Sequence, residues 1–232
     1  MPRPGGRGVR ALVPDDPPSS ALVRLEPPDL PLHLDPVATV GAEGLDCALV
    51  EDAEVPDLRA VGVRIDASRL ERVGLAGARL AAFELRDSEL VGCNLANADL
   101  RGARLHRSRL EGGRLTGLNL GDASLTDVAI EDCRADLAAL GGATLERVRV
   151  ASTSLEQADL QGARLKTVLL EDCDLTGADL TGARFEQVEL RGCRLDGVRG
   201  VTGLRGVAMP WGDVLTNAGA FAAACGVKVL DA

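Results

Sequence analysis

The chain has 232 residues, is 46% hydrophobic but only 2% aromatic, and carries a formal net charge of −9 with a sequence pI of about 4.8. This acidic balance argues against a general nucleic-acid-binding protein, because phosphate contacts require a surplus of Lys and Arg. No run of 18 apolar residues is present, and Arg3, Arg7 and Arg10 are not followed by an apolar segment. We therefore expect no membrane span, no signal peptide, a cytoplasmic location and reduced cysteines.

The first predicted segment, residues 1–36, holds nine of the eleven prolines. Such a segment cannot form a regular helix, and it is interpreted as an irregular leader with an N-terminal cap. Within it, the alternating Leu-Pro-Leu-His-Leu sequence at 30–34 predicts a short edge strand that covers the first coil of the body. His33 is then a surface residue of this cap rather than a ligand.

The second segment is a repeat in which every fifth residue from Leu45 to Leu195 is apolar. Of these 31 positions, 23 are leucine, and no insertion or deletion breaks the register. A period of five fits neither the 3.6 residues of a helix nor the 2 of a strand. It therefore indicates an internal repeat whose unit must be found before any secondary structure is assigned.

Stacking the sequence at twenty residues places like residues on like. Two positions before each central apolar residue lies a second inward position, which is usually small. Taken every twenty residues, these positions form columns such as Ala103, Ala123, Ala143, Ala163 and Ala183, or Ser68, Ser88 and Ser108 followed by Val128, Val148, Val168 and Val188. Four pentapeptides per turn therefore predict a four-sided coil, and glycine supplies its tight corners at Gly102, Gly162, Gly177, Gly182 and Gly192.

Residues 37–200 are accordingly expected to form an all-β solenoid of about eight coils, roughly 37 Å long at a strand spacing of ~4.8 Å. Its hydrogen bonds would run between coils along the axis, so that both ends are open β edges. Each end needs a cap.

The last segment, residues 201–232, is predicted to supply the second cap as a helix from Met209 to Cys225. Pro210 and Asp213 suit a first turn and Gly226 suits a stop. One face of this helix is expected to close the last coil, with Trp211 over it, and the other to pair with a second copy in a homodimer. The alternative is that the tail from Val227 to Leu230 covers that second face. The candidate cap and dimer residues are Trp211, Val214, Leu215, Ala218, Phe221 and Ala222.

The repeat motif Ala-(Asp/Asn/Arg)-Leu-polar-Gly is clearest at 98–102, 158–162 and 178–182. It resembles the pentapeptide-repeat family over about two thirds of the chain, and the flanks and helix resemble actinobacterial members. The resemblance implies a right-handed quadrilateral β-helix without catalytic residues or cofactors. It also implies a possible role known for some relatives, which protect DNA gyrase or topoisomerase as acidic dimeric rods resembling duplex DNA. This chain differs from the plasmid-borne quinolone-protection members in lacking loops that interrupt the repeat.

The sequence contains few candidate catalytic residues. His33 and His106 are the only histidines, and no catalytic or nucleotide-binding signature is present. One column holds Cys93, Cys133 and, in successive coils, Cys173 and Cys193. We interpret these thiols as small apolar filler, because a flat ladder does not converge on a tetrahedral metal site. The alternative is a cysteine-ladder metal or redox protein.

Two outward columns define a candidate partner-binding acidic stripe, which is the name used below for Glu51, Asp52, Glu71, Glu111, Glu131, Asp132, Glu171 and Asp172. Basic columns lie elsewhere on the surface, and residues 45–200 carry 27 acidic and 20 basic side chains. Duplex DNA of the same length would carry about 22 negative charges. The sequence therefore favours a non-catalytic interaction or scaffold protein with a protein partner and no direct nucleic-acid or membrane contact. The sharper alternative is a DNA mimic that binds gyrase and alters quinolone or toxin sensitivity.

Overall fold

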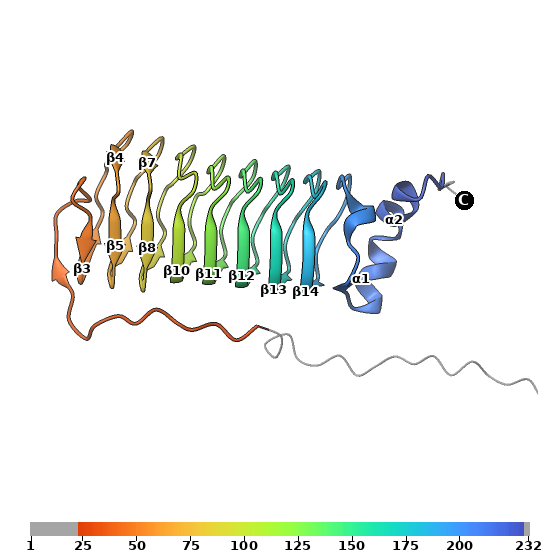
Figure 1. Cartoon of the computed structure of the whole chain (residues 1–232), viewed down its shortest axis with the longest axis horizontal. Helices are drawn as coiled ribbons and strands as arrows, with labels where there is room; N and C mark the ends of the chain where they lie inside the picture. The colour runs from red at the N-terminus through yellow and green to blue at the C-terminus, as the bar shows by residue number, and fades with distance from the viewer. Residues whose placement is uncertain (1–22, 230–232) are drawn as a thin grey trace, which may run out of the picture.

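A computed structural model describes residues 23–229, and its body is a parallel four-sided β-solenoid of about eight coils (Figure 1). The register of the strands is twenty residues throughout: Leu105 pairs with Leu125, and Leu125 with Leu145. This confirms the predicted stacking at twenty. It also explains the uniform columns, since each inward side chain rests on the corresponding side chain of the next coil.

Two adjacent faces of the solenoid carry nearly all of the regular strands. In the early coils these are short, and from β10 onward one strand continues around the corner between both faces. The other two faces are joined by β4 (Arg59–Val61), β7 (Arg79–Ala81) and isolated parallel bridges. The strands of the first two faces are β2 (Leu45–Asp46), β3 (Ala48–Glu51), β5 (Arg64–Asp66), β6 (Arg69–Glu71), β8 (Glu84–Arg86), β9 (Glu89–Val91), β10 (Arg104–Glu111), β11 (Ser124–Glu131), β12 (Thr144–Ala151), β13 (Arg164–Glu171) and β14 (Arg184–Arg191).

The corners are formed by left-handed residues two positions after each central apolar residue. Glycine holds this place at Gly102 and Gly162, with φ of 68° and 66°, as the sequence predicts. The same conformation is adopted by 19 non-glycine residues, many of them Asp. Asp and Asn tolerate the left-handed region better than other L residues, so that charged side chains can stand at corners.

The core lies inside the rod and consists of aliphatic ladders with few aromatic side chains. The central leucines and the smaller inward residues are buried along the whole length. Ser68 and Ser108 are also buried, and their hydroxyls donate to the carbonyls of Asp66 and His106 at 2.6 and 2.9 Å. An inward serine is therefore satisfied by its own strand and needs no functional explanation.

The first coil is capped by β1 (Asp35–Pro36), which pairs in parallel with β3. The N–H groups of Asp35 and Val37 donate to Cys47 and Leu49, both at 2.8 Å, and Pro36 falls between the two donors. The predicted edge strand at 30–34 is wrong, because residues 35–37 take the edge and Leu32 is 99% exposed. His33 is exposed, in agreement with its predicted surface position.

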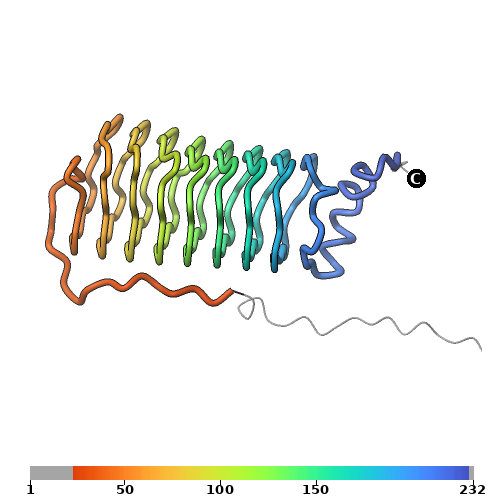
Figure 2. Tube along the Cα trace, viewed as in Figure 1, coloured from red at the N-terminus to blue at the C-terminus, as the bar shows by residue number. Residues whose placement is uncertain are grey.

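Residues 23–34, named the strap below, run from this cap back along the outside of the rod toward its C-terminal end (Figures 1 and 2). The sequence predicts only that the leader covers the first coil. The remainder of the predicted leader lies outside the described residues.

After Gly200 the chain forms a 3-10 turn η2 (Val201–Gly203), the strand β15 (Val207–Ala208) on the edge of β14, and two short helices. These are α1 (Trp211–Thr216) and α2 (Ala218–Ala224). The prediction of one helix over 209–225 is wrong, because the chain breaks at Asn217. No helix within residues 23–229 is long and apolar enough to cross a membrane.

Candidate interaction surfaces

The acidic stripe follows one corner of the rod, but arginines from the neighbouring column pair with much of it. Arg109 Nη2 lies 2.7 Å from Glu131 and 3.2 Å from Glu111. Arg149 bonds both Glu131 and Glu171, the latter at 2.8 Å. The middle of the stripe is therefore a cross-linked network of both signs rather than a run of bare carboxylates.

The N-terminal end of the stripe is also partly neutralised. Arg72 lies 2.6 Å from Asp52, 3.3 Å from Glu71 and 3.6 Å from Glu51. The hydrogen bond from Arg72 holds the pKa of Asp52 below its ordinary value. Asp132 and Asp172 are exposed and belong to no ion pair among the described residues. The surface that the stripe offers to a partner is thus Glu51, Asp52, Asp132 and Asp172, which are the stripe's exposed members.

The C-terminal cap closes the last coil through polar side chains. Asn217 is only 3% exposed, its Oδ1 accepts the N–H of Leu195 at 2.9 Å, and its Nδ2 donates to the carbonyl of Cys193 at 2.9 Å. Asp213 Oδ2 accepts the N–H of Gly192 at 2.6 Å. The two side chains therefore satisfy main-chain groups that an open β edge would leave unpaired.

The apolar residues predicted for this cap divide into two groups. Phe221 packs against the core, and Val214 and Ala222 are half-buried. Trp211 and Leu215 are 66% and 58% exposed, and Ala218 is exposed as well. The prediction that Trp211 closes the last coil is wrong, because Asn217 and Phe221 occupy that place. The alternative in which the tail covers the outer face is also wrong as far as the chain is described, since Val227 and Val229 are exposed.

The cysteine column is buried inside the rod, and each thiol donates to main-chain carbonyls. Cys93 Sγ lies 3.4 Å from Leu70 O, and burial raises the pKa of the Cys93 thiol to about 11. A hydrogen bond with Cys173, together with burial, raises the pKa of Cys193 as well. The same hydrogen bond lowers the pKa of Cys173. Within residues 23–229, no group of three or more His, Cys, Asp or Glu side chains is placed to hold a metal ion. The thiols of Cys93 and Cys193 are protonated and buried, and such thiols are unreactive.

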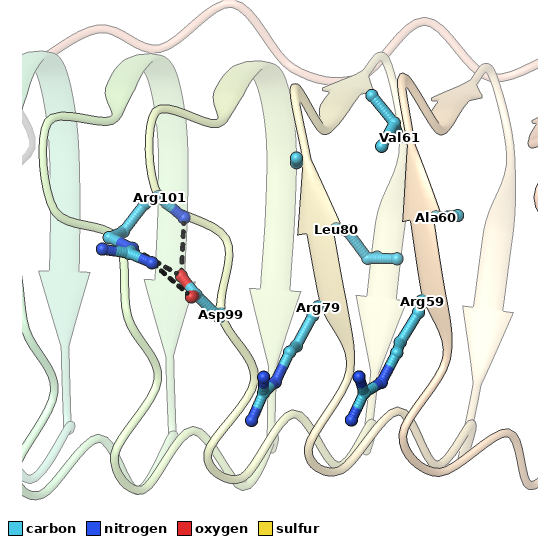
Figure 3. A pocket seen from close by; sticks show the side chains of 8 residues that line it. Arg59, Ala60, Val61, Arg79, Leu80, Asp99 and Arg101 are labelled. Atoms are coloured by element: carbon cyan, nitrogen blue, oxygen red, sulfur yellow. Dashed lines mark hydrogen bonds and ion pairs between the residues drawn. The ribbon is translucent and has the colours of Figure 1, made fainter.

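A shallow concavity of about 350 Å³ lies on the face that carries β4 and β7 (Figure 3). Arg59 and Arg79 stand one coil apart and extend in the same direction, whereas Arg101 is paired with Asp99 at 2.9 Å. The lining is otherwise aliphatic and includes no histidine, cysteine or hydroxyl group. The concavity therefore offers positive charge, and the one carboxylate in its lining, Asp99, is bound by Arg101.

A charged ladder that the sequence interpretation did not single out lies at the corner between the two strand-bearing faces. We call Asp87, Arg107, Asp127 and Arg147 the corner ladder; all four have positive φ. Arg107 Nη2 lies 2.6 Å from Asp87, and Arg147 binds Asp127 through two contacts of 2.7 and 2.8 Å. The side chains of Asp87 and Asp127 are only 7% and 1% exposed, although corner residues point outward.

The strap is the segment that meets these carboxylates. The N–H of Asp29 donates to Asp87 Oδ1 at 3.2 Å, and the N–H of Glu26 donates to Asp127 Oδ1 at 3.4 Å. The Glu26 carboxylate lies 3.8 Å from Arg107 Nη1. The buried carboxylates of the corner ladder therefore bind the strap through its main-chain N–H groups.

The ionisation of the ladder follows from these contacts. Burial pushes the pKa of Asp127 upward, but hydrogen bonds from Arg147 and from the N–H of Glu26 outweigh it, so that the pKa lies below its ordinary value. The pKa of Asp87 is lowered in the same way against burial, by Arg107, by the N–H of Asp29 and by Arg86. Both groups are therefore carboxylates at neutral pH, and the hydrogen bonds from the main-chain N–H groups favour this charged form.

No curated protein matches the sequence. A family model described as Pentapeptide repeats (8 copies) matches residues 74–117, 88–127 and 169–199. Among solved structures, trypsin-treated QnrB1, described as a plasmid-mediated fluoroquinolone resistance protein, is 18% identical over 81% of this chain and 98% of its own, with a TM-score of 0.32. HetL, described as involved in heterocyst differentiation regulation in the cyanobacterium Nostoc sp. strain PCC 7120, is 23% identical over 74% of this chain and 93% of its own, with a TM-score of 0.22.

Proposed function

The chain belongs to the pentapeptide repeat family, and from that premise we propose that it is a non-catalytic interaction protein whose rigid rod presents an acidic-leaning surface to a protein partner. The observation that carries the proposal is the placement of four exposed carboxylates, Glu51, Asp52, Asp132 and Asp172, along one corner of a rod with a fixed coil spacing. A solenoid holds such charges at constant separations, so that a complementary basic surface loses little freedom on binding.

The chemistry of the remaining surface supports a role without catalysis. The thiols of Cys93, Cys133, Cys173 and Cys193 are buried, and the only carboxylate that lines the concavity at Arg59 is paired with Arg101. The partner that fits the stripe is a protein with a basic patch, because the excess of carboxylates repels nucleic acid and anionic membrane surfaces. We place this function in the cytoplasm and without a cofactor.

The test compares two variants with the same change in net charge. The stripe variant removes the four exposed carboxylates, and the control removes four exposed carboxylates outside the stripe. Tagged proteins are produced in the source cells, and co-purified proteins are quantified by mass spectrometry. We expect a protein that accompanies the wild type and the control but not the stripe variant; identical sets in all three would contradict the proposal. The stripe variant is Glu51→Gln, Asp52→Asn, Asp132→Asn and Asp172→Asn, and the control is Asp122→Asn, Glu156→Gln, Glu186→Gln and Asp196→Asn.

A narrower version names the partner as DNA gyrase or a related type II topoisomerase, with the rod in place of duplex DNA. The excess of acidic over basic side chains in residues 45–200, 27 against 20, favours this version. The pairing of Arg109 and Arg149 with the stripe weakens it, because it neutralises the middle of the rod. Supercoiling by purified gyrase is measured with and without the protein. Absence of any effect at tens of micromolar, together with unchanged quinolone sensitivity, would eliminate this version.

We further propose that the exposed apolar side of α1 pairs two copies of the chain. Trp211 and Leu215 are the large side chains left exposed there. Light scattering at micromolar concentration is expected to give twice the chain mass of 24.1 kDa, and Leu215→Lys is expected to return it to the monomer value. A wild-type mass of one chain would contradict the proposal.

A further inference from the structure

We propose that the corner ladder is a binding site for an extended peptide of the acidic-Pro-Pro-X type from another protein, and that the strap fills this site in cis. The site lies one corner away from the acidic stripe, so that it does not depend on the function proposed above. Its occupant is identified by the contacts that the strap makes with Asp87, Arg107 and Asp127.

The spacing of the ladder matches an extended proline-rich chain. Asp87 and Asp127 are two coils apart, about 9.6 Å at a strand spacing of ~4.8 Å. A polyproline II segment rises about 3.1 Å per residue with three residues per turn, so that residues i and i+3 lie on one side about 9.3 Å apart. Glu26 and Asp29 are such a pair, and each donates its N–H to one of the two carboxylates.

The prolines explain why Glu26 and Asp29 are the residues that lie opposite the two carboxylates. Pro27 and Pro28 separate the two donors and have no N–H of their own, so that neither leaves an unpaired donor against the rod. Two prolines also hold the segment extended before it binds, which reduces the entropy lost on docking. The acidic residue at the first position has its own partner in Arg107, 3.8 Å away.

The strap does not use all that the groove offers. A concavity of about 310 Å³ remains between Glu26, Pro27 and Pro28 on one side and Ser108, Arg109 and Asp127 on the other. Arg107 Nε and Arg109 Nε are buried without a hydrogen-bond partner. The two main-chain bonds, at 3.2 and 3.4 Å, are longer than the usual 2.9–3.0 Å. A peptide that supplies an acceptor to either arginine therefore binds better than the strap and can displace it.

The experiment uses the full chain in a form whose own strap is weakened. Glu26→Pro and Asp29→Pro remove the two N–H donors and leave the rod unchanged. The probe is a fluorescein-labelled peptide with the sequence of residues 23–32, and its binding is followed by fluorescence anisotropy. We expect it to bind the E26P/D29P chain at least tenfold more tightly than the wild-type chain, in which the strap competes. A control peptide carrying both proline substitutions is expected not to bind.

A second variant locates the site. Adding Asp87→Ala and Asp127→Ala to the E26P/D29P chain removes the acceptors, and alanine is compatible with this corner because Ala67 holds the same column with a φ of 45°. We expect binding of the peptide to be lost while a cooperative melting transition shows that the rod is still folded. Absence of binding to the E26P/D29P chain at 1 mM peptide would overturn the proposal, and so would binding that survives Asp87→Ala and Asp127→Ala.

Sedimentation of the wild-type chain mixed with the E26P/D29P chain decides between a foreign peptide and the strap of a second copy. The proposal predicts that any association between these two proteins at 50 μM is independent of Asp87 and Asp127, as expected for pairing through α1. A complex that requires Asp87 and Asp127 would assign the groove to a second copy and overturn it.

Discussion

The rod is covered at its C-terminal end and along one corner, and the two coverings use opposite chemistry. At the end, the rod supplies main-chain groups of Gly192, Cys193 and Leu195, and the cap supplies the side chains of Asp213 and Asn217. At the corner, the rod supplies the side chains of Asp87 and Asp127, and the strap supplies main-chain N–H groups.

The difference reflects what each surface of a solenoid exposes. An open β edge presents the same donors and acceptors whatever its sequence, so that recognition has to come from the residues of the cap. A corner presents only side chains, so that the residues of the rod determine what binds there. The covering segment needs little more than main-chain N–H groups at the spacing of the rod's acceptors. The C-terminal end is therefore covered by one specific cap, whereas the corner can accept any segment whose N–H groups match the spacing of its carboxylates.

The largest expected effect is loss of the end seal. Asn217→Ala leaves the N–H of Leu195 and the carbonyl of Cys193 buried without partners, and we expect it to lower the free energy of unfolding by roughly 3 kcal/mol. Urea unfolding measures the change. Thr216→Ala is the control, because Thr216 is exposed and bonds only within α1. A loss in the Asn217 variant no greater than in the control would show that the helices do not seal the edge through this residue.

A smaller effect is expected at the corner. Asp127→Ala removes the acceptor for Arg147 and for the strap, whereas Asp132→Ala removes an exposed carboxylate from a corner with a closely similar φ, 54° against 52°. The strain of a left-handed alanine is therefore common to both variants. We expect the Asp127 variant to be less stable than the Asp132 variant by about 1–2 kcal/mol in urea unfolding. Equal stabilities would mean that the buried contacts of Asp127 contribute nothing.

Acid should release the strap without unfolding the rod. The folded-state pKa values of Asp87 and Asp127 lie below their ordinary values, so that their contribution is complete above the unfolded pKa of about 3.9 and is lost as the pH falls through the folded values. Nitrogen-15 NMR of the Glu26 and Asp29 amides is expected to show a transition with its midpoint below pH 3.9. A midpoint above pH 3.9 would mean that the pKa values of Asp87 and Asp127 are raised in the folded protein, contrary to this prediction.

The smallest effect is expected at a corner that neither covering reaches. Leu137 is 58% exposed and has a φ of 59°, a conformation that disfavours leucine. Leu137→Asn should raise the free energy of unfolding by about 0.5–1 kcal/mol, because asparagine tolerates this region. Leu137→Ala removes the exposed side chain but keeps the strain, and it should give no gain. A gain in both variants would trace the effect to hydrophobic exposure instead.

The parts of the fold that sequence reasoning found are those that repeat. The apolar residues from Leu45 to Leu195 and the columns at Ala103 and Ser68 specify the coil, because the same pattern of apolar and small residues recurs in every turn. The corner ladder obeys the same spacing of twenty, but its partner does not repeat. Nothing in residues 23–34 carries the period of the rod, so their course along its side could not be predicted from periodicity.

The cap was mispredicted for a related reason. Val214, Ala218, Phe221 and Ala222 keep helical spacing across Asn217, so that the pattern predicts one continuous helix. The break arises because the side chain of Asn217 bonds the last coil, a contact between segments that local spacing does not encode. The one signal of the break in the sequence is Asn217 itself, a polar residue among small apolar ones.

Hydrogen exchange at the strap shows most directly whether buried carboxylates of the rod hold the main chain of another segment. The amides of Glu26 and Asp29 should exchange slowly at neutral pH, while the amide of Leu32, whose side chain is 99% exposed in the same strap, should exchange at the rate of an unstructured peptide. The protection should disappear in Asp127→Ala for Glu26 and in Asp87→Ala for Asp29. If Glu26 and Asp29 exchange as fast as Leu32 in the wild-type protein, the corner ladder does not bind the strap.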